Sequence, residues 1–267
     1  MKLVLALDTS TEELAVALGY FRDGGVHLAG ETNLDVPRAS LTHLVPSISR
    51  LLESADVELR DVDAVVVGRG PGSFTGVRIG VATAKGIAQG LGAPLYGIGT
   101  LDAVAERFVG RDGLVGVVGD AMRAEVYPAL FTLSAGRLER SGPDCVMKPA
   151  RAAEQWASLG REVLLAGNGL RKYASVFLEA MGERAEVAPE SMWAPTGESL
   201  LVAAWRAWKA GTLGDGEAAT VLPVYTRLSD AEEAERTRRG EAGSDAPASG
   251  VAGPSGEPPT PVDGAAS

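Results

Sequence analysis

Short apolar runs of strand length alternate along this chain with longer stretches in which apolar residues recur every three or four positions. The short runs are rich in β-branched residues and end at glycine, proline or acidic residues, as buried strands do. One stretch of helical period begins at Ser40 and ends at Ser54, and Pro46 within it is expected to bend the helix. The strands predicted for the first half are 3–7, 13–18, 26–32, 65–67 and a run that ends at Ile98.

The order of elements in the first half recurs in the second half. The first strand leads into Asp8, and Glu13 opens the next strand five residues later; Asp120 and Glu125 repeat this spacing. Each half then continues with a third strand, a helix, a strand with a glycine turn, and another helix. This pattern predicts an α/β protein with a duplicated ribonuclease-H-like fold, its lobes at 1–110 and 111–228. The counterparts predicted in the second half are 115–119, 125–130, 138–146 and 163–169.

A glycine-rich loop after the buried strand 65–67 provides a candidate phosphate site. Ser73 or Thr75 is placed to cap the helix that follows, and free amides at a helix N-terminus stabilise an anion. The spacing of glycines and lysines matches neither a Walker A loop nor a dinucleotide fingerprint, and a tight strand-to-helix connection is the alternative interpretation. The candidate nucleotide-contacting residues are Asp8, Thr9, Ser10, Gly70, Gly72 and Ser73.

Two predicted helices carry apolar or small residues along whole faces, which suits contact with a partner. Glycine inside a helix costs about 1 kcal/mol relative to alanine, and close approach of another helix would offset that cost. The alternative is that these faces pack on the chain's own sheet. On the partner hypothesis, Gly80→Leu or Leu44→Asp should disrupt the contact. The candidate interface residues are Leu41, Leu44, Val45, Ile48, Leu52, Gly76, Gly80 and Ala84, and a second small-residue face holds Ala82, Gly86 and Gly90.

Composition limits the classes of function. The net charge of −10 argues against this chain being the main contact with a nucleic acid. Cys145 is the only cysteine and His27 and His43 are the only histidines, so we expect no metal site. No apolar run approaches a membrane span and the chain starts directly with a strand, so we expect a cytoplasmic protein. Eight acidic residues and three arginines lie in 229–267, which is predicted to be an acidic disordered tail.

Four short segments together resemble the TsaB (YeaZ) family. They are LALDTST at 5–11, GPGSFTG at 70–76 followed by RIG at 78–80, DAMRAEVY at 120–127 and PVYTR at 223–227. The resemblance covers nearly all of residues 1–228. It implies an ASKHA, actin-like form of the duplicated fold and a role in making threonylcarbamoyladenosine (t6A) next to the anticodon of tRNA.

The resemblance also implies a non-catalytic scaffold that activates the paralogous threonylcarbamoyltransferase TsaD. Further implied partners are the ATPase TsaE and a second copy of the chain, with tRNA bound only through the complex. No cofactor of its own is expected, and ATP or ADP would bind at the junction with the partner. The interface helices named above would pair with their counterparts in TsaD.

Two features of the residues agree with a non-catalytic role. The related catalytic subunit carries a metal-binding histidine pair where this chain has Gly99, Thr100 and Leu101. ASKHA ATPases have a second phosphate loop rich in glycine and threonine after an aspartate, whereas here Met122 and Arg123 follow closely after the aspartate and would sit where the phosphate should. The alternatives are an independent ASKHA-type ATPase or phosphotransferase, with Asp8 orienting magnesium or water, and a homodimer with an unrelated regulatory role.

Overall fold

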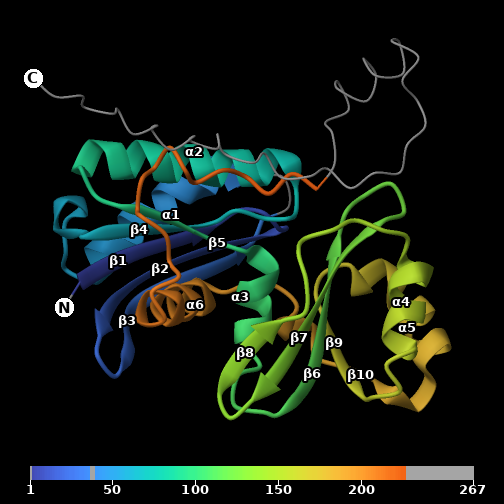
Figure 1. The fold of residues 1–267 in the computed structure, drawn as a ribbon. Coiled ribbons are helices and arrows are strands. Elements are labelled where there is room, and N and C mark those ends of the chain that lie inside the picture. Colours follow the sequence, from blue (N-terminus) through green and yellow to red (C-terminus); the bar gives the residue numbers. More distant parts are fainter. Residues whose placement is uncertain (1, 37–39, 227–267) are drawn as a thin grey trace, which may run out of the picture. The chain divides into compact units, whose positions relative to one another are not determined.

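The first half of the chain forms one five-stranded sheet (Figure 1). The structure is a computed structural model that describes residues 2–36 and 40–226. The strands are β1 (Lys2–Asp8), β2 (Glu13–Arg22), β3 (Gly25–Asp35), β4 (Ala64–Gly68) and β5 (Leu95–Ile98). Their order in the sheet is β3-β2-β1-β4-β5. β1, β2 and β3 pair antiparallel, whereas β4 and β5 extend the sheet from β1 in parallel.

The second half forms a second sheet with the same design. Its strands are β6 (Gly113–Asp120), β7 (Val126–Ser134), β8 (Arg137–Arg140), β9 (Val163–Ala166) and β10 (Ala185–Val187). They follow the order β10-β9-β6-β7-β8, again with three antiparallel strands and then two parallel ones. Because both sheets place their first to fifth strands in the order 3-2-1-4-5, the duplicated ribonuclease-H-like fold is confirmed.

The strand predicted at 138–146 is wrong in its length, because β8 ends at Arg140. Gly142 has a φ of 157°, and Pro143 lacks the amide that would continue the ladder. After this break, Met147 forms an isolated bridge with Val126. The second sheet therefore has a much shorter edge strand than the first.

In residues 2–36 and 40–226, six helices cover the two sheets. The predicted helix from Ser40 to Ser54 is confirmed, and Pro46 lies inside it. Within the described ranges, no helix is long and apolar enough to cross a membrane. The helices are α1 (Ser40–Ser54), α2 (Phe74–Leu91), α3 (Thr100–Glu106), α4 (Pro149–Ala157), α5 (Leu170–Met181) and α6 (Gly197–Lys209), with 3-10 turns η1 (Leu59–Asp61), η2 (Gly182–Arg184) and η3 (Glu190–Met192).

Alternation along β1 explains how its sheet is covered on both faces. Leu3, Leu5 and Leu7 point to one face and pack with α1 and α2, whereas Val4 and Ala6 point to the other and pack with α6. Figure 1 shows α1 and α2 on one side of this sheet and α6 on the other. All five side chains are buried. The sheet is therefore a central layer between helices, which is why its strands are apolar throughout.

The predicted lobe boundary at 110/111 lies between the strands of the first sheet and those of the second, whereas two helices pack across it. Leu200 and Leu201 of α6 are buried against the first sheet, although α6 comes after the last strand of the second. Leu101 and Val104 of α3 are buried with strands of the second sheet. The chain up to Tyr225 forms one compact unit. The predicted tail at 229–267 lies outside the described residues.

Candidate functional site

The carboxylate of Asp8 is completely buried at the end of β1. Its Oδ1 accepts a hydrogen bond from the Ser10 amide at 2.6 Å, and its Oδ2 accepts one from Thr100 Oγ1 at 2.7 Å. Burial raises the pKa of this carboxyl, and the hydrogen bonds from Ser10 and Thr100 oppose that rise. Gly68 lies close to it, because a Cβ there would be 1.9 Å from Asp8 Oδ2. The chain itself therefore satisfies the carboxylate.

Thr100, the first residue of α3, joins three segments of the chain. Its hydroxyl donates to Asp8, accepts from the Gly70 amide at 3.2 Å and lies 2.8 Å from Ser10 Oγ. Because the Thr100 hydrogen goes to Asp8, the Ser10 hydroxyl is the donor in the third contact. The sequence drew attention to Thr100 only because no histidine stands at this point of the chain. A threonine at the start of a helix that follows a buried strand is the signal that could have revealed it.

Two glycines let the glycine loop pack directly against the loop that follows β1. A Cβ on Gly72 would lie 2.3 Å from Ser10 O, and a Cβ on Gly76 would lie 2.0 Å from Thr9 O. Ser73 N donates to Ser10 O at 2.7 Å, and Thr9 Oγ1 donates to Gly76 O at 2.6 Å. Ser73 Oγ also accepts from Gly76 N, which confirms the predicted helix cap. Contact between the two loops thus explains these glycines without a phosphate.

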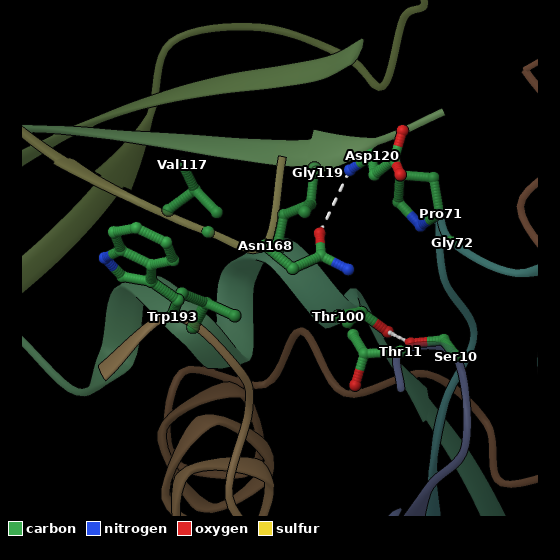
Figure 2. Close-up of a pocket in the computed structure, with 13 residues that line it drawn as sticks. Ser10, Thr11, Pro71, Gly72, Thr100, Val117, Gly119, Asp120, Asn168 and Trp193 are labelled. Atoms are coloured by element: carbon green, nitrogen blue, oxygen red, sulfur yellow. Dashed lines mark hydrogen bonds between the residues drawn. The ribbon is translucent and has the colours of Figure 1, made fainter. Parts of the chain in front are cut away.

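A small cavity lies where loops of both halves meet (Figure 2). Its volume of about 10 Å³ has room for roughly one water molecule, so a nucleotide would require it to widen. Ser10 and Gly72 line it, whereas the other predicted nucleotide-contacting residues, Asp8, Thr9, Gly70 and Ser73, do not. The rest of the lining is Thr11, Pro71, Thr100, Leu101, Val104, Val117, Gly119, Asp120, Gly167, Asn168 and Trp193.

The turn after Asp120 has an unusual backbone. Met122, Arg123 and Ala124 have φ angles of 61°, 48° and 57°, in the left-handed region that costs about 1–2 kcal/mol for each L-residue. Asp120 Oδ1 accepts from the Met122 amide at 3.0 Å, and Asn168 Oδ1 accepts from the Asp120 amide at 3.0 Å (Figure 2). Neither Met122 nor Arg123 lines the cavity, and Met122 is 59% exposed. Three residues of this turn therefore adopt a backbone conformation that favours glycine, although none of the three is a glycine.

We expect Ala124→Gly to stabilise the protein by about 0.5–1 kcal/mol, because glycine adopts a positive φ without steric cost. Thermal or denaturant unfolding measures the change. Ala82→Gly is the matched control, since Ala82 lies exposed inside α2 and the same substitution there should destabilise by about 1 kcal/mol. Equal losses for the two variants would contradict the strain at Ala124.

Most of the predicted interface residues face the chain's own core, and their assignment to a partner surface is wrong. A Cβ on Gly80, for example, would lie 2.5 Å from Thr9 Oγ1. Val45 is 57% exposed, whereas the side chain of Leu41 lies outside the described residues. Leu44→Asp and Gly80→Leu would therefore disrupt the fold itself. The residues that face inward are Leu44, Ile48, Leu52, Gly76, Gly80 and Ala84.

The exposed surface of α1 and α2 lies on the opposite sides of these helices. Arg78 stacks 3.8 Å above the centroid of the Phe74 ring, and its Nε donates to Tyr225 Oη at 3.0 Å. The Phe74 and Tyr225 rings are themselves 5.6 Å apart. Beyond this cluster, a Cβ on Gly86 or Gly90 would meet no atom within 4 Å. We call the exposed residues of α1 and α2, together with Tyr225, the α1–α2 face.

The two sheets and their paired loops define a duplicated ribonuclease-H-like protein of the actin-like class. A protein-family model described as TsaD, tRNA N6-adenosine threonylcarbamoyltransferase, matches residues 35–235. The chain belongs to the TsaB family of tRNA threonylcarbamoyladenosine biosynthesis proteins, which is related to TsaD.

Three relatives illustrate the match. The TsaB protein of Bacillus subtilis is 30% identical over 229 residues, which cover 86% of this chain and 96% of that protein. The TsaB protein of Escherichia coli is 33% identical over 180 residues, which cover 66% of this chain and 76% of that protein. A crystal structure from Pseudomonas aeruginosa, described as an uncharacterized protein with similarity to peptidase YEAZ, superposes with a TM-score of 0.71. It is 34% identical, and the match covers 85% of this chain and all of that one.

Proposed function

We propose that this chain is a non-catalytic subunit in t6A biosynthesis that binds and activates a TsaD-type threonylcarbamoyltransferase. The observation that carries the role in t6A is the match to the B. subtilis protein, which covers 96% of that tRNA threonylcarbamoyladenosine biosynthesis protein. In the same proposal, the ATPase TsaE completes the complex in the cytoplasm. tRNA then binds only through the complex, and ATP or ADP binds at the junction with the partner.

The Asp8 network supports the non-catalytic part of the proposal. A carboxylate that orients magnesium or water must face a space that admits them, but Asp8 is completely buried and accepts hydrogen bonds from Ser10 and Thr100. Thr100 stands where the related catalytic subunit has a metal-binding histidine pair, and its hydroxyl is used to hold the loops together. The residues that would perform chemistry in a catalytic relative serve here as internal supports.

The α1–α2 face supports the partner part of the proposal. Phe74 and Tyr225 are 42% and 47% exposed, and Val45 on α1 is 57% exposed. Aromatic residues are enriched in protein interfaces because they combine a large apolar area with little loss of side-chain entropy. Gly86 and Gly90 present no side chain on the outer surface of α2, which permits close approach of another helix at these positions. We therefore place the partner contact on the outer surface of the two helices.

Val45→Asp is expected to weaken binding to the TsaD-type partner by at least tenfold, because it places a charge in an apolar contact. Stability should change by less than about 0.5 kcal/mol, since Val45 is exposed. Leu44→Asp is the matched control: the neighbouring side chain is 1% exposed, so the same charge should unfold the protein. Isothermal titration calorimetry and thermal unfolding separate the two effects.

The proposed function is tested by reconstitution. The chain is mixed with the TsaD-type protein of the same organism, and the complex is sized by chromatography with light scattering. TsaE, ATP, threonylcarbamoyl-adenylate and tRNA are then added, and t6A is measured in digested tRNA by mass spectrometry. We expect a heterodimer, and loss of t6A when this chain is omitted. Absence of a heterodimer, together with ATP hydrolysis by the chain alone, would favour an independent ATPase.

A further inference from the structure

The side chain of Arg171 connects segments that lie far apart in the chain. Arg171 lies in the first turn of α5, where its Nη1 donates to a carboxylate oxygen of Glu12 and its Nη2 lies 3.4 Å from Glu13 Oε1. Its Nε donates to Glu190 Oε1 at 2.8 Å. Glu12 and Glu13 lie at the turn between β1 and β2 of the first sheet, whereas α5 and the η3 turn, which holds Glu190, pack with the second sheet. We call these four residues the Arg171 ion cluster.

The same three segments border the small cavity. Thr11, Asn168 and Trp193 line it, and each lies within three residues of a member of the ion cluster. Figure 2 shows these three residues among those around the cavity. Because Arg171 ties the segments together, it limits how far their lining residues can separate. The cavity volume of about 10 Å³ belongs to the state in which all of these contacts are made.

Helix α3 connects the two sheets by apolar contacts instead. Ala103 is buried with residues of the first sheet, whereas Leu101 and Val104 are buried with residues of the second. Figure 1 shows α3 between the two sheets. Salt screens exposed ion pairs but leaves apolar contacts in place. The two sheets are therefore joined by a buried core at α3 and by largely exposed charges at the Arg171 ion cluster.

Arg171 is the member of the cluster on which the others depend. Three carboxylates converge on its guanidinium, and they come from elements of both sheets. Burial raises the pKa of Glu13, and beyond the cluster Asp35 raises it further while Arg107 lowers it, so these two outer charges oppose each other. Without Arg171, like charges would face one another beside the cavity and would disfavour the closed arrangement.

We propose that the Arg171 ion cluster is a releasable contact that holds the two sheets closed over the cavity, with α3 as the fixed side about which they open. Loss of Arg171 should let the turn between β1 and β2 move away from α5 while the apolar contacts of α3 persist. The cavity would then widen at Thr11, Asn168 and Trp193. This device goes beyond the proposed function and does not rest on it, because every contact involved lies within the one chain.

Charge determines what can release the contact. A cation competes with Arg171 for the three carboxylates, and a carboxylate competes with them for Arg171. High salt weakens all of these pairs at once. A neutral molecule competes with none of them. The closed state should therefore respond to ionic strength.

Arg171→Gln tests the proposal, and Lys172→Gln is its matched control. The two side chains are neighbours on α5, both are exposed, and each change removes one positive charge. Lys172 pairs with Asp120 at 2.5 Å, and both of these residues lie on elements of the second half. In the described part of the chain, Arg171→Gln is thus the one of the two variants that removes ion pairs between the sheets.

Distances between spin labels on the two halves measure the opening. The labels are attached after Glu53→Cys and Glu179→Cys, at two exposed positions on α1 and α5, in a Cys145→Ser background. Pulsed electron paramagnetic resonance gives the distance distribution at about 50 and about 500 mM salt. Fluorine NMR of the chain labelled with fluorotryptophan reports on the cavity itself, because Trp193 lines it.

At the lower salt, the population with longer label distances should be about tenfold larger in Arg171→Gln than in the wild type, because exposed ion pairs are lost and repulsion remains. The Trp193 signal should shift in the same variant. The wild type at the higher salt should approach this variant, whereas Lys172→Gln should match the wild type at both salts. The double variant Glu12→Gln, Glu13→Gln removes the same contact without leaving those like charges, so it should open less than Arg171→Gln.

Thermal unfolding shows whether each variant is folded, and the double variant carries the test where Arg171→Gln is not. Three results would overturn the inference: unchanged label distances in the folded variants of the cluster, equal opening in Lys172→Gln, or wild-type distances that do not respond to salt. All of these measurements are made on the chain alone. Their failure would therefore leave the proposed function standing, and failure of the reconstitution would leave this inference standing.

Discussion

Gly76→Ala is expected to destabilise the protein by about 3 kcal/mol or more, a large part of the stability of a typical native protein. The new Cβ would lie 2.0 Å from the Thr9 carbonyl oxygen, which is a backbone atom that cannot rotate away. Relief requires that α2 move away from the loop after β1. That movement would lengthen the bond between Thr9 Oγ1 and Gly76 O, now 2.6 Å.

Gly86→Ala provides the control for this effect on the same helix. A Cβ at Gly86 meets nothing within 4 Å, so alanine should stabilise α2 by about 0.5–1 kcal/mol. Denaturant unfolding of the two variants gives the comparison, and similar stabilities would show that the loops are not packed as described. On the proposed function, Gly86→Ala should also weaken partner binding, because its methyl group lies on the α1–α2 face.

Asp8→Ala is expected to cost about 2–4 kcal/mol of stability, because it leaves the Ser10 amide and the Thr100 hydroxyl without their acceptor in a buried site. Asp8→Asn should remain within about 1 kcal/mol of the wild type. Its Oδ1 still accepts from the Ser10 amide, and its Nδ2 donates to Thr100, whose own hydrogen then turns to Ser10. The network is kept, with two of its hydrogen bonds reversed in direction.

The pH dependence of unfolding shows whether the folded protein favours the protonated or the ionised form of Asp8. Because burial raises the pKa of Asp8 in the folded state, the folded protein holds this proton more tightly than the unfolded chain does. The contribution of Asp8 to stability is therefore fully present below the unfolded pKa of about 4 and is lost as pH rises through the folded value. Asp8→Asn should remove this loss of stability at higher pH. The free energies of unfolding of the wild type and the variant should therefore differ more at pH 7 than at pH 3. A wild-type chain whose Asp8-dependent stability rises over this range would show that the carboxylate is stabilised as an anion.

The fold was largely predictable from the sequence because its strands are buried on both faces. Val65, Val66 and Val67 form an apolar run that only a central strand tolerates, and the spacing from Asp8 to Glu13 marks the same turn in both halves. The end of β8 was missed because apolar residues continue after the break at Gly142. Which helices cover which sheet was not predictable either, since the apolar stripe of α6 does not show which sheet it packs against.

The candidate site was predicted less well than the fold. Of the candidate nucleotide-contacting residues, Ser10 and Gly72 line the same cavity, because both follow strands that end at the same edge of a parallel pair. The stripe of Leu44 and Ile48 was interpreted as a partner surface, although a period of 3.6 marks the buried side of any surface helix. On the proposed function, the partner surface is instead marked by Phe74, an aromatic residue at the start of a helix and outside its apolar stripe.

The packing of α6 on the first sheet has a consequence for synthesis of the protein. A ribosome releases β1 to β5 long before Gly197–Lys209, so the nascent chain carries a sheet with one apolar face that its own later helix must cover. Until then, Val4, Ala6 and Ala17 are open to chaperones and to other nascent chains. The N-terminal half thus cannot complete its folding before α6 has been synthesised, and a ribosome that stalls before α6 would release an aggregation-prone fragment.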